Sequence, residues 1–257
     1  MLRSLGGGAM FGERWGEGPP TVLALHGWRR THGDFAASLG PRAEGGPLAC
    51  LAPDLPGFGA TPEPPAVWGS PQYAEAVAGL LDGSDGPSPE GGVVVVGHSL
   101  GGRVAVHLAA ERPELVAALV LTGAPLMPSG RGRARAPVSF RAARALHRVG
   151  LVGEARMEAA RQRHGSADYR AARGRMRDIL VRIVNERYEE ALAALRCPVE
   201  LVWGDDDGDA PLPVAEAIRA AVPGARLTVC HGAGHLTPLT VPEAVRAATE
   251  RALAGRR

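Results

Sequence analysis

Four consecutive valines, Val93–Val96, constrain the fold of this chain more than any other feature. Gly91-Gly92 precede them and Gly97 follows. A run of branched apolar residues without polar alternation is typical of a strand that is buried on both faces, as in parallel sheets. A helix-compatible run, Arg103–Arg112, begins shortly afterwards. Because strand followed by helix is the repeating unit of α/β proteins, this stretch predicts an α/β fold.

The turn between that strand and helix carries the pattern Gly-X-Ser-X-Gly, at Gly97, Ser99 and Gly101. The pattern is typical of a nucleophile elbow, in which a sharp turn lifts the Ser hydroxyl clear of the sheet. The start of the helix also offers free N–H groups and a positive dipole to a developing oxyanion. With 35 Gly in the chain the same pattern also arises by chance, so the candidate nucleophile Ser99 needs partners elsewhere in the sequence.

The rest of the chain alternates between short apolar runs and helical segments. Further strands are expected at Thr21–Leu25, Leu48–Ala52, within Leu115–Thr122, at Val199–Trp203 and Arg226–Cys230, with a weaker one at Ala9–Trp15. Helices are expected from Phe35, and at Gln72–Leu81, Pro213–Ala221 and Pro242–Ala254. The alternation predicts a doubly wound, mostly parallel sheet with helices on both faces.

Residues 126–189 differ from this pattern, because strand signals vanish and Arg and Ala dominate. We expect an inserted helical cap here, which divides the core into residues 1–125 and 190–257. Between Arg131 and Arg187 there are fifteen Arg and five acidic residues. One interpretation is that one or two of these arginines bind an anionic group of a substrate in bidentate fashion. The alternative is that they all lie on solvated helix faces.

Charge and cysteine content exclude several classes of function. The net charge is only +2, although all 29 basic residues are Arg, so nucleic acid and membranes are not expected partners. The three Cys lack metal-ligand spacing and a disulfide framework, which indicates a reducing compartment and no metal. Met1–Gly16 contains no apolar segment typical of a signal peptide. We therefore expect a cytoplasmic protein, either a monomer or a dimer.

Four motifs, in this order, resemble those of the α/β-hydrolase fold superfamily, in its serine-nucleophile, esterase-like branch. They are His26-Gly27-Trp28, Asp54–Gly59, Gly97–Gly102, and Trp203–Asp207 followed by Gly232–His235. The resemblance covers about Thr21–Thr122 and Val199–Ala254. It implies the α/β-hydrolase fold, with the cap inserted between the sixth and seventh strands.

The resemblance also implies a catalytic triad of Ser99, Asp207 and His235. In such triads the His takes the nucleophile's proton, and the acid holds the imidazole tautomer and stabilises the imidazolium. The acid fits Asp207 because Gly204–Asp207, with Pro211 after it, follows the family pattern; Asp209 is the alternative. The order Ser, acid, His along the chain is that of the α/β hydrolases.

By the same resemblance, the backbone N–H groups of Leu100 and Trp28 form an oxyanion hole, while the Trp28 indole alternatively lines the acyl pocket. His26 is expected to shape its loop, and His98 to pack behind the elbow. Residues Asp54–Gly59 are expected to brace a loop near the site.

The sequence thus predicts a serine hydrolase, without cofactor or metal, that cleaves a small carboxylic ester or related acyl substrate through an acyl-enzyme. A carbon–carbon bond hydrolase, a thioesterase, an acyltransferase and a haloperoxidase-like enzyme use the same three side chains, so the triad does not separate them. A non-catalytic small-molecule receptor on this fold is the alternative from another class.

Overall fold

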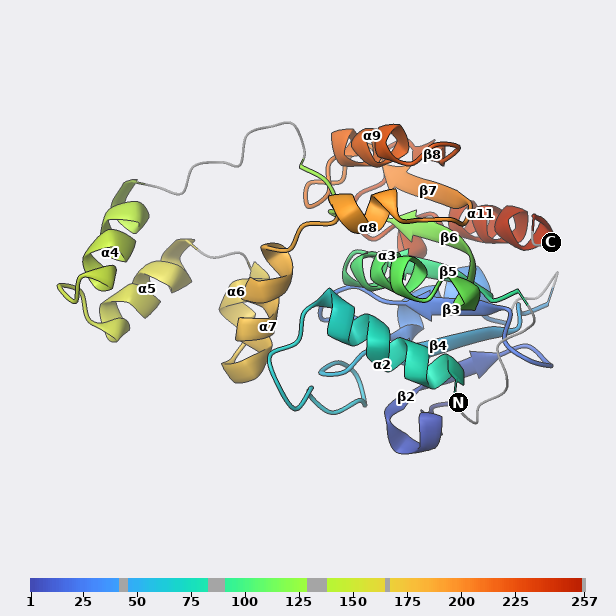
Figure 1. Cartoon of the computed structure of the whole chain (residues 1–257), viewed down its shortest axis with the longest axis horizontal. Coiled ribbons are helices and arrows are strands. Elements are labelled where there is room, and N and C mark those ends of the chain that lie inside the picture. Colours follow the sequence, from blue (N-terminus) through green and yellow to red (C-terminus); the bar gives the residue numbers. More distant parts are fainter. Residues whose placement is uncertain (42–45, 83–90, 129–137, 165–166, 256–257) are drawn as a thin grey trace.

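The computed structural model describes residues 1–41, 46–82, 91–128, 138–164 and 167–255. Within them, one eight-stranded sheet has the strand order β1-β2-β4-β3-β5-β6-β7-β8 (Figure 1). The strands are β1 (Arg3–Leu5), β2 (Met10–Trp15), β3 (Val22–Leu25), β4 (Cys50–Asp54), β5 (Val93–His98), β6 (Val116–Thr122), β7 (Val199–Gly204) and β8 (Arg226–Cys230).

The strands from β4 to β8 pair in parallel, and β1 and β2 add an antiparallel edge. This confirms the doubly wound, mostly parallel sheet that the sequence predicts. Strand β2 falls within the weak signal at Ala9–Trp15, whereas β1 was not expected. A three-residue edge strand beside a Gly-rich turn offers too few apolar residues for a periodicity to be recognised.

Helices cover both faces of the sheet, which explains the unbroken valine run in β5. Val93 and Val95 pack in a core shared with α2 (Ser70–Asp82), α3 (Leu100–Glu111) and α9 (Leu212–Ala221). Val94 and Val96 face the opposite core, shared with α1 (Ala36–Leu39) and α11 (Pro242–Ala254). Alternate residues of one strand therefore fill two cores, and no polar position is left in the run.

Every described element between β6 and β7 is a helix. These are α4 (Val138–Arg148), α5 (Glu154–His164), α6 (Ala167–Ala171), α7 (Gly174–Val184) and α8 (Glu189–Ala193). Helix α7 buries Met176, Ile179, Leu180 and Ile183, while α4 and α5 pair with each other away from the sheet (Figure 1). Helix α8 continues past residue 189, so the division into core and cap stays a prediction. Arg131, Arg133 and Arg135 lie outside the described residues.

No described helix has both the length and the apolar character needed to cross a membrane. The remaining short elements are three 3₁₀ helices, at Gly6–Gly8, His32–Phe35 and Pro113–Leu115, and α10 at Thr237–Thr240.

The junction of β5 and α3 brings two backbones into contact. Only Ser99 separates the strand from the helix, which begins three residues before the predicted Arg103. A Cβ atom on Gly101 would lie 1.9 Å from the carbonyl oxygen of Leu25, and one on Gly97 would lie 2.7 Å from the carbonyl oxygen of Gly101. Because backbone atoms cannot withdraw without displacing β3 or α3, both positions require glycine.

We therefore expect Gly101→Ala to lower the free energy of unfolding by about 1–3 kcal/mol or more, the usual cost of overpacking. Chemical denaturation measures the change. Gly79→Ala in α2 is the matched control, since no atom lies within 4 Å of its added Cβ. That control should stabilise the protein by roughly 0.5–1 kcal/mol through helix propensity. An equal effect of the two substitutions would contradict the close approach at Gly101.

Candidate active site

Ser99 sits in a strained turn at the carboxyl end of β5. Its φ of 51° and ψ of −108° put a residue with a Cβ in the positive-φ region. Such a conformation costs on the order of 1–3 kcal/mol and persists only where the surroundings enforce it. Here the Ser99 amide donates to the Thr122 carbonyl at 3.0 Å, and the Ser99 carbonyl accepts from the amides of Gly102 and Arg103. The strain and these bonds identify the turn as the predicted elbow.

Two loops at the same edge of the sheet bring His235 to Asp207. His235 follows β8 and Asp207 follows β7. The Nδ1 atom of His235 lies 2.9 Å from Oδ2 of Asp207 and 3.1 Å from Oδ1. Because an ionised carboxylate only accepts hydrogen bonds, Nδ1 carries the hydrogen and Nε2 keeps its lone pair. The pair therefore holds His235 in the tautomer that a general base needs.

The Asp207 carboxylate is itself held in place. Its side chain is fully buried, and Oδ1 accepts the amide N–H groups of Asp209 at 2.9 Å and Ala210 at 2.8 Å. The sequence offers Asp207 and Asp209 as the acid, and the structure brings Asp207 to His235. Asp209 supports it through its backbone, and its own side chain lines the neighbouring pocket.

Burial by itself lowers the pKa of His235, since a charged imidazolium loses water. The hydrogen bond to Asp207 and the charge of Asp207 outweigh burial, and the charges of Asp209 and Asp168 add to them. The net result is a pKa of His235 raised above its ordinary value of 6.5. The site thus favours an imidazolium, the state that a base reaches once it has taken a proton.

The loop after β3 lies against the elbow. The Gly101 amide donates to the His26 carbonyl at 3.0 Å, and a Cβ on Gly27 would lie 2.8 Å from the His98 ring. The structure gives the amides of Trp28 and Leu100 no acceptor among the described residues. Both residues line one pocket and Leu100 begins α3, so these two amides remain the predicted oxyanion donors.

Two further histidines are buried and neutral. Nδ1 of His26 donates to the Gly27 carbonyl at 2.7 Å, and Nε2 accepts the Leu55 amide at 2.8 Å, so this ring ties two loops together. Nε2 of His98 donates to the His235 carbonyl at 2.9 Å. Burial lowers the pKa of each to about 4. His98 therefore positions the His235 backbone without adding charge beside its ring, which lies 4.9 Å away.

The loop Asp54–Gly59 braces the site, as the sequence indicates. Oδ1 of Asp54 accepts the amide and Nδ1 of His32 at 2.9 Å and 2.8 Å, and Oδ2 accepts the Ala60 amide at 3.0 Å. Phe58 packs edge-on against Trp28 with ring centroids 4.9 Å apart. The loop thus fixes the side chain of Trp28 through its aromatic contact.

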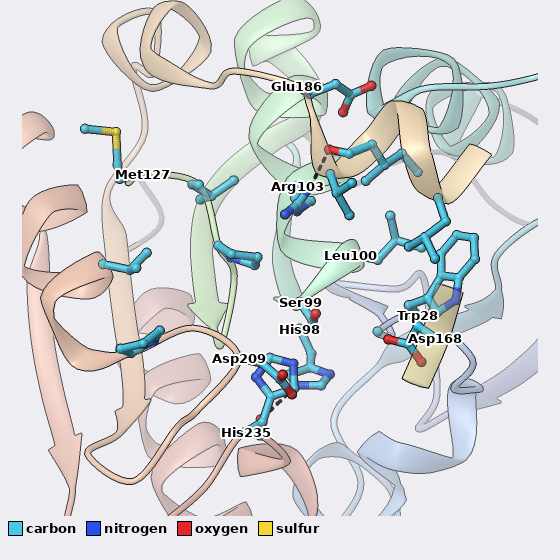
Figure 2. A pocket seen from close by; sticks show the side chains of 18 of the residues that line it. Trp28, His98, Ser99, Leu100, Arg103, Met127, Asp168, Glu186, Asp209 and His235 are labelled. Carbon is cyan, nitrogen blue, oxygen red and sulfur yellow. Dashed lines mark hydrogen bonds between the residues drawn. The ribbon is translucent and has the colours of Figure 1, made fainter. Parts of the chain in front are cut away.

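Several of these residues line a pocket of about 1020 Å³ (Figure 2). Ser99, His235, Trp28 and Leu100 all line it, so the structure brings together the predicted nucleophile, base and oxyanion donors. The opposite wall comes from the helical insertion, with Asp168, Leu180, Ile183, Val184, Asn185, Glu186, Arg187 and Glu189. Among the described arginines of residues 131–187, Arg187 is the one in the lining, and its side chain is 88% exposed.

Sequence reasoning missed several charged residues of this pocket, among them Arg103 and Asp168. Arg103 follows Ser99 by four residues and lies in the first turn of α3, which begins at Leu100. That spacing was a usable signal. Asp168 belongs to α6 and forms an ion pair of 3.6 Å with Arg29, beside the Trp28 loop. Nothing in the sequence around Asp168 indicates that it lies beside Arg29.

The sequence pattern of the alpha/beta hydrolase family matches residues 22–248. The chain belongs to this family. The family match includes β3 through most of α11, and therefore every site residue described above.

Several members of the alpha/beta hydrolase family are similar to this chain. Lipase LipV of Mycobacterium tuberculosis is 48% identical over 42% of the chain, which covers only 39% of that lipase. The pimeloyl-[acyl-carrier protein] methyl ester esterase of Aromatoleum aromaticum is 30% identical over 87% of the chain and 94% of the esterase. A thermophilic esterase from Thermogutta terrifontis superposes with a TM-score of 0.67 at 25% identity, over 99% and 98% of the two chains. Esterases and lipases thus stand among the relatives of this hydrolase.

We expect Asp207→Asn to lower the pKa of His235. Burial lowers that pKa, and the neutral amide lacks the negative charge that raises it. NMR titration of the His235 ring measures the shift. Asp209→Asn is the matched control and should lower the pKa of His235 less, since its charge acts without a hydrogen bond to the ring. A larger shift from Asp209→Asn would reverse the assignment of the acid.

Proposed function

We propose that this alpha/beta hydrolase is a serine hydrolase that cleaves a small carboxylic ester or a related acyl substrate through an acyl-enzyme. The observation that carries the proposal is the buried Asp207 bonded to His235, in one pocket with a strained Ser99. A structural turn has no need of a positive-φ serine beside an oriented imidazole. The esterase and lipase relatives support ester cleavage as the reaction.

In the proposed mechanism, Oγ of Ser99 attacks the acyl carbonyl while Nε2 of His235 takes the hydroxyl proton. The oxyanion that forms accepts hydrogen bonds from the amides of Leu100 and Trp28. Collapse of the tetrahedral intermediate breaks the bond to the leaving group, which receives the proton from His235. A water molecule, deprotonated by His235, then attacks the acyl-enzyme and releases the acid and Ser99.

The charge around His235 suits this cycle. Asp207 stabilises the imidazolium that forms when Ser99 attacks, and the neutral His98 does not repel it. His235 and His98 therefore have different tasks, because of these two only His235 is bonded to a carboxylate. The difference in charge between the two rings follows from their burial and their hydrogen bonds.

Ser99→Ala should abolish turnover of p-nitrophenyl esters, with a loss on the order of 10⁴-fold or more in kcat. Release of p-nitrophenol from a series between acetate and decanoate measures the loss. The chain-length optimum also reports how much of the pocket the acyl group fills. Wild-type turnover that survives Ser99→Ala would contradict the acyl-enzyme mechanism.

A serine-directed phosphonate separates this proposal from a receptor on the same fold. The reagent should label wild type and leave Ser99→Ala unlabelled, as read by intact-protein mass spectrometry. Stable ligand binding without labelling or turnover would favour the receptor. Labelling without turnover of any simple ester would favour a carbon–carbon bond hydrolase, a thioesterase or an acyltransferase.

Activity should fall as the pH decreases through the pKa of His235. That pKa lies above 6.5, and the protonated ring cannot accept the proton of Ser99. The acid limb of kcat/KM should therefore lie above pH 6.5 and move to lower pH in Asp207→Asn, whose overall rate falls by on the order of 10⁴-fold. An acid limb that stays in place in Asp207→Asn would mean that another group controls it.

A further inference from the structure

Arg103 brings a positive charge into the inner wall of the pocket. It lies in the first turn of α3, three residues after Leu100, which begins the helix directly after Ser99. Its side chain is 9% exposed and lines the same pocket as Ser99 (Figure 2).

The guanidinium group is held but its charge is not neutralised. Nη1 donates to the carbonyl of Ile183, and the group lies over the ring of Tyr188 with its carbon 5.4 Å from the centroid. Within the part of the chain that the structure describes, no carboxylate lies within 4.0 Å of it, and the other N–H groups of its fork have no partner.

The other two arginines of the pocket lining behave differently. Arg30 forms a bidentate pair with Asp34 at 2.7 Å and 2.6 Å, and Arg187 lies 4.0 Å from Glu189 in an exposed position. A buried charge without a counterion is costly, so natural proteins normally pair it. Arg103 departs from that rule at a position that faces the pocket.

The acidic residues of the lining do not supply the missing counterion. The Glu186 carboxylate accepts the Ser70 amide at 3.0 Å and the Tyr188 hydroxyl at 2.7 Å. Asp168 pairs with Arg29 across the loop after β3. Glu189 faces Arg187, and Asp209 lies beside the His235 pair. Each acid of the lining therefore has another partner, and the negative charge that would neutralise Arg103 has to come from a ligand.

We propose that Arg103 binds a carboxylate of the substrate, so that the hydrolase prefers acyl substrates with a second, anionic end. This inference rests on the proposed function and names the substrate class. The planar fork of the guanidinium suits bidentate binding of a carboxylate, and the pocket excludes much of the competing water. The spacing of about one helical turn from Ser99 requires a short chain between the reacting carbonyl and the anion.

Two ester series test the proposal. Mono-p-nitrophenyl esters of dicarboxylic acids, from succinic to suberic, are compared with neutral p-nitrophenyl alkanoates of the same chain length. Wild type should prefer the anionic ester at the best length, and the ratio of the two kcat/KM values is the readout. Acetate esters of hydroxycarboxylic acids, whose anion lies on the leaving group, show which side of the ester the carboxylate occupies.

Arg103→Met should lower the anionic-to-neutral ratio by roughly 10–100-fold, the loss expected for a charge-assisted hydrogen-bonded contact. The change should appear mainly in KM, and Arg103→Lys should restore part of it. Arg246→Met is the matched control, since Arg246 is equally buried but pairs with Glu250 at 2.7 Å outside the pocket lining. That control should leave the ratio unchanged.

The outcomes separate the two proposals. In one outcome, wild type turns over neutral esters in a Ser99-dependent way and shows no preference for the anionic ester in either series. That result overturns the role of Arg103 but supports the proposed serine hydrolase. An equal loss on both kinds of ester in Arg103→Met reduces Arg103 to a structural brace. If no ester is turned over, calorimetric binding of free adipate to Ser99→Ala, with and without Arg103→Met, decides the carboxylate site independently of catalysis.

Discussion

The close approach of β5 to α3 is the constraint on which the rest of the site depends. Gly97 lets β5 meet the first turn of α3, Gly101 lets that turn meet β3, and the turn between β5 and α3 has room for a single residue. Ser99 is forced into a positive φ there, and the same turn leaves the Leu100 amide at the start of a helix. The positions of the proposed nucleophile and of one proposed oxyanion donor therefore follow from the packing of one turn.

The parallel sheet supplies the remaining groups, since the carboxyl ends of parallel strands open on the same edge. The loops after β3, β5, β7 and β8 deliver Trp28, Ser99, Asp207 and His235 to that edge. Few hydrogen bonds are then needed to set the geometry. Those of His98 to the His235 carbonyl and of the Asp209 and Ala210 amides to Asp207 fix the loops relative to the sheet.

The sequence predicts the strands and motifs well because each depends on local rules. The valine run, the glycines of the elbow and the helices at Gln72–Leu81 and Pro242–Ala254 are all found in the structure. The choice of Asp207 over Asp209 also agrees with the observed pairing. The strands, helices and elbow share a cause, since periodicity and spacing act within a few residues of the chain, whereas the choice of Asp207 came from the resemblance to the family pattern.

The failures arise where burial and charge depend on distant contacts. The arginines of residues 131–187 drew attention by number, yet the pocket takes its buried charge from Arg103 on a core helix. Whether an arginine on α3 faces solvent or the pocket depends on Ile183 and Tyr188, some eighty residues away. A composition bias toward Arg conceals such a position, because every Arg looks alike until its surroundings are known.

Burial has different effects on the histidines and on the arginine around the pocket, because the two side chains differ in how readily they lose a proton. His26 and His98 respond to desolvation by becoming neutral, because imidazole gives up its proton readily. Arginine does not, since its guanidinium stays protonated in proteins, so burial of Arg103 leaves a permanent charge. The pocket thus combines the permanent charge of Arg103 with that of His235, which changes as the ring takes up and releases a proton. An anionic substrate end held at the first would be kept apart from the second, and the imidazolium would remain available to Asp207 and to the developing oxyanion.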